Sequence, residues 1–106
     1  MASITIPVEM EYDGTYWVAR CEALGLVAAT SEQRDTWHRI FNMVGAQLCF
    51  ALNQSIAPDK VFTPAFSDLA DTVAECKRRK HDIRVTIEDR ARGLSADDIM
   101  PAQACR

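Results

Sequence analysis

Apolar and polar residues alternate near the start of the chain. From Ile4 to Tyr12 every second residue is apolar, and mostly polar or charged residues stand between them. A period of two predicts a strand with one buried face. Pro7 lies within this segment and donates no backbone hydrogen bond, so we expect the strand at a sheet edge or beginning after a bulge.

The residues that follow predict a hairpin. Asp13-Gly14 is a favoured pair for a two-residue loop. The segment 15–21 is rich in Thr, Tyr, Trp and Val, which are typical of strands, and it predicts the return strand. A turn at Gly25 is followed by a short apolar run over 26–29, which predicts a third strand.

A helical period replaces the alternation after residue 30. The segment Thr30-Ser-Glu-Gln33 has capping-box spacing and predicts a helix start. The helix is expected over 31–53, with an apolar stripe formed by Trp37, Ile40, Val44, Leu48 and Ala51. A second, shorter helix is expected over 65–80, where basic residues in the last turn complement the carbonyl end of the helix dipole.

The order of these elements predicts an α+β fold. Alternation over 83–87 indicates a fourth strand, which gives the order β-β-β-α-α-β. We expect a three- to four-stranded, mainly antiparallel sheet packed against one long and one shorter helix. Residues 1–88 are expected to form a single domain and 89–106 a mobile tail, in which Ser95-Ala-Asp-Asp98 favours one short helical turn.

Composition and charge narrow the class of protein. The chain of 106 residues is 48% hydrophobic and 25% charged, as in ordinary globular domains. Its net charge of −3 is unevenly placed, because residues 1–74 carry nine acids and four bases and the remainder six acids and eight bases. No apolar run is long enough for a membrane span and the start lacks the pattern of a signal peptide, so a cytoplasmic location without membrane contact is expected.

Candidate reactive groups are few. The four cysteines form no CxxC or CxxH pair, and we expect them to be small buried hydrophobes, except Cys105 in the tail. His38 follows Trp37 on the predicted helix and His81 follows the basic run, so a structural role is favoured for both. The chain contains no phosphate-binding or nucleophile motif. We therefore expect no enzyme activity, no cofactor and no metal site.

Charged and aromatic residues leave binding as the alternative to catalysis. Glu9 and Glu11 are spaced as in a solvated strand face, which is favoured over a metal-dependent nuclease site. Together with the aromatic residues of the predicted hairpin and first helix they are protein-interface candidates: Glu9, Glu11, Tyr16, Trp17 and Trp37.

A basic run offers a second candidate surface. It consists of Lys77, Arg78, Arg79 and Lys80, with Arg84 close behind. The run is interpreted as a solvated helix end, a nucleic-acid site that could extend to Arg92, or a contact for an acidic protein. Interleaved acids favour the solvated helix end.

The stretch from the acidic strand to the capped helix resembles the HicB antitoxin-like family. Tyr16-Trp-Val-Ala19 is similar to the second strand of that family, Glu22-Ala-Leu-Gly25 to its turn, and Thr30-Ser31 to the start of its helix. The resemblance covers about residues 4–52, and it departs from the family pattern at Asp35-Thr-Trp37. It implies a partial, catalytically empty ribonuclease H-like fold that binds another protein and forms a dimer or larger assembly.

These observations favour an antitoxin-like inhibitor that sequesters a partner nuclease without catalysis. One alternative is an anti-CRISPR-like inhibitor from a phage or mobile element, directed at a host nuclease complex. Another is a nucleic-acid-binding regulator that uses the basic region 77–92. A protein partner and a homodimer are expected under the first two hypotheses.

Overall fold

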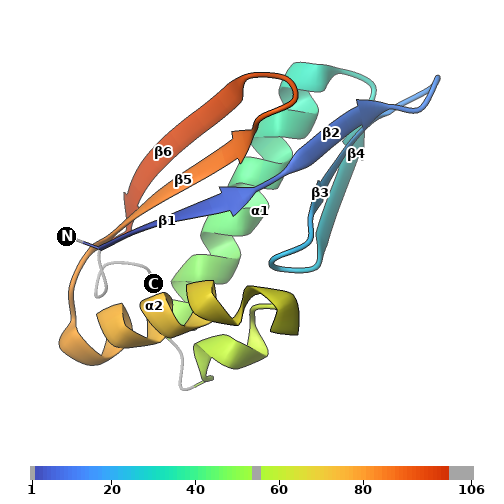
Figure 1. Ribbon diagram of the computed structural model, residues 1–106. Coiled ribbons are helices and arrows are strands. Elements are labelled where there is room, and N and C mark those ends of the chain that lie inside the picture. Colours follow the sequence, from blue (N-terminus) through green and yellow to red (C-terminus); the bar gives the residue numbers. More distant parts are fainter. Residues whose placement is uncertain (1, 54–55, 101–106) are drawn as a thin grey trace.

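The computed structural model describes residues 2–53 and 56–100, which form six strands, two α-helices and two short 3-10 turns (Figure 1). Cys105, expected in a mobile tail, lies outside the described residues. The elements in chain order are β1 (Ala2–Pro7), β2 (Glu9–Tyr12), β3 (Trp17–Cys21), β4 (Leu26–Thr30), α1 (Gln33–Asn53), η1 (Pro58–Lys60), η2 (Pro64–Phe66), α2 (Ser67–Arg79), β5 (Ile83–Asp89) and β6 (Leu94–Met100).

The α+β class and the pairing of one long with one shorter helix are confirmed. The strands form two three-stranded sheets rather than one, with the orders β1-β5-β6 and β2-β3-β4. We call these the first and the second sheet. Only β1 and β5 run parallel, and the other three neighbouring pairs are antiparallel.

The predicted first strand divides at Pro7 and Val8. Its first part, β1, pairs with β5, and its second part, β2, pairs with β3. Because Pro7 has no N–H, it suits β1, which is an edge of the first sheet as expected. The Val8 N–H donates to the Glu88 carbonyl at 2.8 Å, so the chain passes from one sheet to the other without losing its backbone bond.

The hairpin loop is longer than predicted. Tyr12 stands opposite Trp17, so the loop contains the four residues Asp13 to Tyr16, and the prediction of a two-residue loop is wrong. The Asp13 side chain accepts the N–H groups of both Thr15 and Tyr16, which stabilises this wider turn. Gly14 supplies the positive φ of 99° that the turn needs.

The last described strand, β6, was not expected. Residues 95–98, predicted as a short helical turn, lie in β6, which is antiparallel to β5. Regular structure therefore extends beyond residue 88, where the sequence predicted a mobile tail. The alternation is obscured because β6 is an exposed edge strand, with Asp97 and Asp98 adjacent and both facing water.

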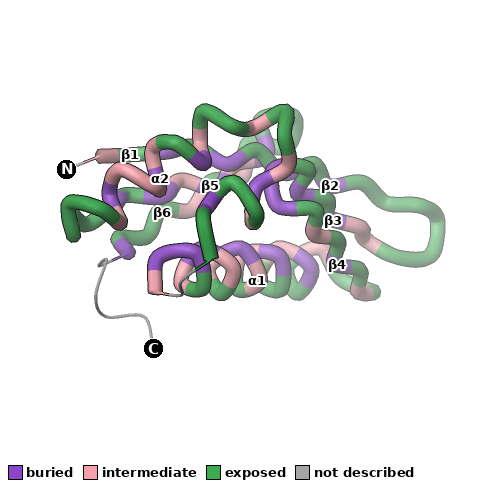
Figure 2. Tube along the Cα trace, turned by 90° about the horizontal axis from the view of Figure 1, so that it is seen from below, coloured by how far each residue is buried: buried purple, intermediate pink, exposed green. Residues whose placement is uncertain are grey.

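One core joins the two sheets. Every second residue from β1 through Val8 to β2 faces this core. These residues are Ile4, Ile6, Val8 and Met10, and all four are buried. Helix α1 packs on β3 and β4, while α2 packs on β1 and on α1. Figure 2 shows the buried residues between α1 and the strands. Among the described helices, none is long and apolar enough to cross a membrane.

Local sequence explains the helix ends. α1 begins at Gln33, where the Thr30 hydroxyl accepts the Glu32 N–H at 3.2 Å and lies 2.6 Å from the Thr36 hydroxyl. At the end of α2, Lys80 adopts the left-handed conformation, and the His81 N–H donates back to the Cys76 carbonyl. This is a Schellman ending with Lys in place of the usual Gly.

Candidate protein-binding surface

The most exposed aromatic residues lie on the hairpin formed by β2, β3 and their loop. We call residues 9–20 the acidic hairpin, because its acids are Glu9, Glu11 and Asp13 and its one base is Arg20. Tyr12 is 53% exposed and Tyr16 is 50% exposed. The hairpin projects from the body of the molecule (Figure 1), so these side chains are accessible together.

The carboxylates of the acidic hairpin differ in what they contact. Glu11 forms an ion pair with Arg20 at 2.8 Å across the two strands. Within the described part of the chain, the exposed Glu9 side chain has no hydrogen bond or ion pair. Asp13 Oδ1 accepts N–H groups from Tyr16 at 2.7 Å and Thr15 at 2.8 Å, which hold the pKa of Asp13 below its usual value.

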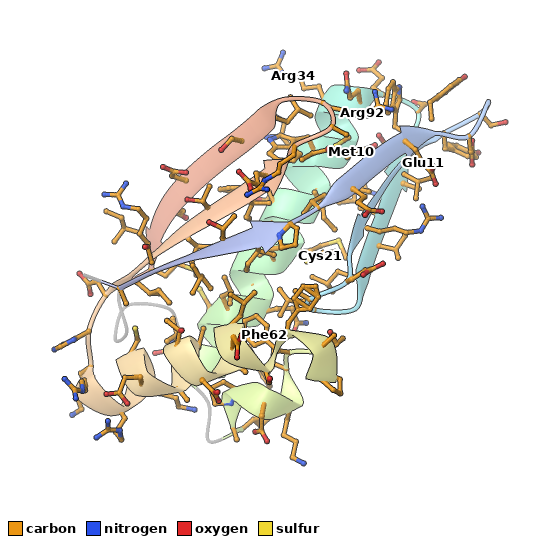
Figure 3. The ribbon with its side chains drawn as sticks, viewed as in Figure 1. Met10, Glu11, Cys21, Arg34, Phe62 and Arg92 are labelled. Carbon is orange, nitrogen blue, oxygen red and sulfur yellow. The ribbon has the colours of Figure 1, made fainter. Side chains whose placement is uncertain are left out.

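Arg92 supports the aromatic side of the hairpin. Its guanidinium lies 4.6 Å from the centre of the Trp17 ring, and its Nε donates to the Met10 carbonyl at 2.8 Å. The ring of Tyr12 also contacts Trp17, with its centre 5.5 Å from that of the Trp17 ring. Figure 3 shows Arg92 and Met10 close together where the β5–β6 turn meets β2. Arg92 thus fixes Trp17, which is half-buried.

Asp89 connects the two sheets from the same turn. It is 2% exposed, its Oδ2 accepts the Met10 N–H at 2.9 Å, and its Oδ1 accepts the Arg92 N–H at 3.3 Å. A buried side chain that satisfies two backbone donors is costly to remove. Sequence reasoning missed this role, because residue 89 was expected to begin a mobile tail.

A shallow groove lies on the outer face of the sheets, where the first sheet meets the second. It measures about 550 Å³ and is lined in part by Pro7, Glu9 and Glu88. A smaller hollow of about 240 Å³, lined by Glu9, Glu11 and Arg20 among others, shares Glu9 with it. The outer face beside the hairpin is therefore indented and carries carboxylates.

The predicted interface residues are divided between two environments. Glu9, Glu11 and Tyr16 lie exposed on the acidic hairpin, while Trp17 is half-buried beneath Arg92. Trp37 is half-buried on α1 and packs against the core. The hairpin thus unites four of the five candidates, and Trp37 serves the packing of α1.

The basic run lies at the end of α2, and one acid, Glu75, pairs with two of its four bases. Glu75 forms ion pairs with both Arg78 and Arg79, and the hydrogen bond from Arg78 is the main cause that lowers the pKa of Glu75. Lys77 Nζ donates to the Ile56 carbonyl at 3.0 Å. Lys80 is exposed at the end of the helix.

Basic residues further along the chain do not extend this run. Arg84 lies 3.8 Å from Asp97 at the beginning of β5, and Arg90 pairs with Glu88 at the other end of that strand. Arg92 lies beyond the same end, on Trp17. The length of β5 separates Arg90 and Arg92 from the end of α2 and from Arg84. The continuous basic stripe from residue 77 to Arg92 that was considered from sequence is therefore not formed.

Side chains of the kinds used in catalysis are dispersed. His38 and His81 are both exposed. Burial raises the pKa of the Cys21 thiol and that of Cys76, which keeps both thiols protonated and weakly nucleophilic. Within residues 2–53 and 56–100, no three His, Cys, Asp or Glu side chains converge as metal ligands.

Comparisons with protein-family models, with curated proteins and with solved structures found no match to this chain. The resemblance to HicB antitoxin-like proteins therefore stays a prediction from sequence.

Proposed function

We propose that this chain is a non-catalytic, antitoxin-like inhibitor that uses the acidic hairpin to cover the nucleic-acid-binding surface of a partner nuclease. The observation that carries the proposal is the projecting hairpin itself, on which two half-exposed tyrosines stand among Glu9, Glu11 and Asp13. Inhibition by coverage needs area and complementary charge rather than reactive groups.

Charge supports a nuclease as the partner. A nuclease must hold phosphates, so the surface that it presents to nucleic acid is rich in Lys and Arg. The segment from Glu9 to Tyr16 contains three acids and no base. An acidic surface attracts such a basic face at long range. Tyrosines that are exposed in the free protein become buried when the partner binds, and buried aromatic side chains of this kind dominate binding energy.

The anti-CRISPR-like alternative uses the same surface, because a nuclease complex also presents basic faces to nucleic acid. The two readings differ in the identity of the partner rather than in the residues that bind it. The nucleic-acid regulator is placed second, because Glu75 and Asp97 pair with Arg78, Arg79 and Arg84 in the basic region.

Affinity isolation with two matched variants tests the proposal. The tagged chain is used to recover its partner from the native host, and the recovered protein is then assayed for cleavage of labelled RNA and DNA with and without added chain. The hairpin variant is Glu9→Ala/Tyr16→Ala, whose two side chains are exposed and make no side-chain hydrogen bond among the described residues. The control is Arg78→Ala/Arg79→Ala, with the same number of changes at the end of α2.

We expect the wild-type chain to retain a nuclease and to inhibit it at about equal concentration. The hairpin variant should bind at least on the order of thirtyfold more weakly, the effect of losing one binding hot spot, while the control inhibits like the wild type. Retention of the nuclease by the hairpin variant and its loss by the control would contradict the proposal. Cleavage of nucleic acid by the purified chain alone would also overturn it.

A further inference from the structure

Each described sheet has two edge strands, β1 and β6 in the first and β2 and β4 in the second, and they differ in how they are protected. β6 carries the adjacent, exposed Asp97 and Asp98, β2 carries Glu9 and Glu11, and β1 ends at Pro7. Charges and Pro oppose pairing with another strand. The sequence of β4, Leu-Val-Ala-Ala-Thr, contains no charge, no Pro and no Gly. Of the four, only β4 lacks the features by which proteins block edge-to-edge pairing.

The surroundings of β4 leave its outer edge open. β4 pairs with β3 on one side and packs against α1, and no described strand pairs with its other side (Figure 1). Val27 is 57% exposed, the highest value among the large apolar side chains of the described residues. An uncharged edge beside an exposed Val presents unpaired backbone groups together with apolar surface.

Helix α1 continues the apolar surface behind this edge. Thr36, Met43 and Phe50 are seven residues apart and therefore share one stripe of the helix. The Thr36 hydroxyl contacts the Thr30 hydroxyl of β4, so this stripe lies on the β4 side of the helix. Thr36 is buried, Met43 is half-buried and Phe50 is 44% exposed, so the stripe turns from the core toward solvent.

We propose that the β4 edge binds the β4 edge of a second copy of this chain, in antiparallel orientation about a two-fold axis at Ala28. In this register Val27 stands opposite Ala29 of the second copy, and Leu26 opposite Thr30. No charge meets a like charge, although each copy carries a net charge of −3. The same operation about Asp97, the middle residue of β6, would bring Asp97 against Asp97 of the second copy, so charge favours β4 over β6 as the self-association edge.

The interface is independent of the proposed inhibition. In the second sheet β4 and β2 are on opposite sides of β3, so pairing through β4 leaves the acidic hairpin uncovered. The dimer would join two second sheets into one six-stranded sheet and would present two hairpins.

Two double variants test the edge and its register. Val27 and Ala29 both face outward, and Val27 stands opposite Arg20 of β3 within the chain. In Val27→Glu/Ala29→Glu, two pairs of like charges meet across the proposed interface. In Val27→Glu/Ala29→Lys, the same two positions form opposite-charge pairs with the second copy. Both variants place Glu opposite Arg20, so their effects inside one copy are matched at position 27.

Sedimentation velocity over a concentration series measures the dissociation constant of each protein. We expect a wild-type dimer, a dissociation constant raised on the order of tenfold or more in the Glu/Glu variant, and recovery of the dimer in the Glu/Lys variant. A wild-type chain that stays monomeric throughout the series, or a Glu/Glu variant that dimerises like the wild type, overturns the proposal. A Glu/Lys variant that dimerises as weakly as the Glu/Glu variant overturns the register at Ala28.

A different protein is the other occupant that this edge could take. Loss of nuclease binding when β4 is changed in a chain that is monomeric would show that the nuclease, rather than a second copy, pairs with this edge, and it would overturn the proposal.

Cross-linking supplies a measurement that needs no charged substitution. Val27→Cys and Ala29→Cys chains are oxidised separately and as an equal mixture, with the wild-type chain as the control for its native cysteines. We expect covalent dimer to form faster in the mixture than in either variant alone, because positions 27 and 29 are directly opposite across the interface. Equal rates in the three samples contradict the proposed pairing.

Discussion

The two sheets share one N-terminal segment, yet they are built differently. The second sheet is a local meander, in which β2, β3 and β4 follow one another within residues 9–30. The first sheet joins β1 to β5 and β6, which come after both helices. The local sheet carries the exposed tyrosines and the open edge, whereas the first sheet has charged β6 at its edge. The first sheet thus holds the ends of the described chain together, and the second presents the contact surfaces.

The sharpest way to break the link between the sheets is Asp89→Ala. This change leaves the buried Met10 N–H without its acceptor and removes the bond to the Arg92 N–H. We expect the free energy of unfolding to fall by about 2–3 kcal/mol, as measured by urea denaturation. Asp97→Ala is the matched control in the same sheet, where an exposed pair with Arg84 should be worth no more than about 0.5 kcal/mol. Equal stability of the two variants would show that Asp89 does not couple the sheets.

A smaller effect is expected from Arg92→Ala, which weakens the support of the second sheet by the β5–β6 turn. The variant loses the contact over Trp17 and the bond to the Met10 carbonyl, so the expected cost is about 1–2 kcal/mol. Urea denaturation followed by tryptophan fluorescence measures it. Arg90→Ala, which removes only an ion pair at an 88% exposed arginine, should leave stability nearly unchanged. If the Arg90 variant is the less stable one, the role given to Arg92 is wrong.

The smallest effect concerns the loop of the acidic hairpin and its response to pH. Hydrogen bonds from the Tyr16 and Thr15 N–H groups favour the charged form of Asp13 and lower its pKa below 3.8. A depressed folded pKa means that the stabilisation is present above the unfolded pKa and is lost as the pH falls through the folded pKa. In an NMR titration, the Thr15 and Tyr16 amide shifts should therefore change with a midpoint below 3.8. The same shifts should not show this transition in Asp13→Asn, and a midpoint above 3.8 in the wild type would contradict the assignment.

The parts that could be predicted from sequence are those that depend on neighbouring residues. Alternation located the strands of the second sheet, and helical spacing placed α1 within about two residues of its observed start. The loop length was missed, because the preference of Asp13-Gly14 for a tight turn competes with the bonds that the Asp13 side chain makes. Local preference favours a turn type, but side-chain bonds decided it here.

The parts that could not be predicted depend on distant contacts. β6 has adjacent aspartates and little apolar alternation, so its strand character comes from pairing with β5 rather than from its own sequence. Asp89 and Arg92 acquire their roles only when the β5–β6 turn reaches Met10. Glu9, Glu11, Tyr16 and Trp17 could be placed on one hairpin from sequence because its strands and loop are local, whereas Arg92, which contacts Trp17, is far along the chain.

The pairing of β1 with β5 also has a consequence for biosynthesis. The register places Ala2 beside Ile83, so β1 is synthesised about eighty residues before the strand with which it pairs. The meander over residues 9–30 can close much earlier, because each of its strands follows directly on its neighbour. A nascent chain halted before residue 83 should therefore hold the meander while its N-terminal strand stays sensitive to protease, until translation delivers the strand that protects it.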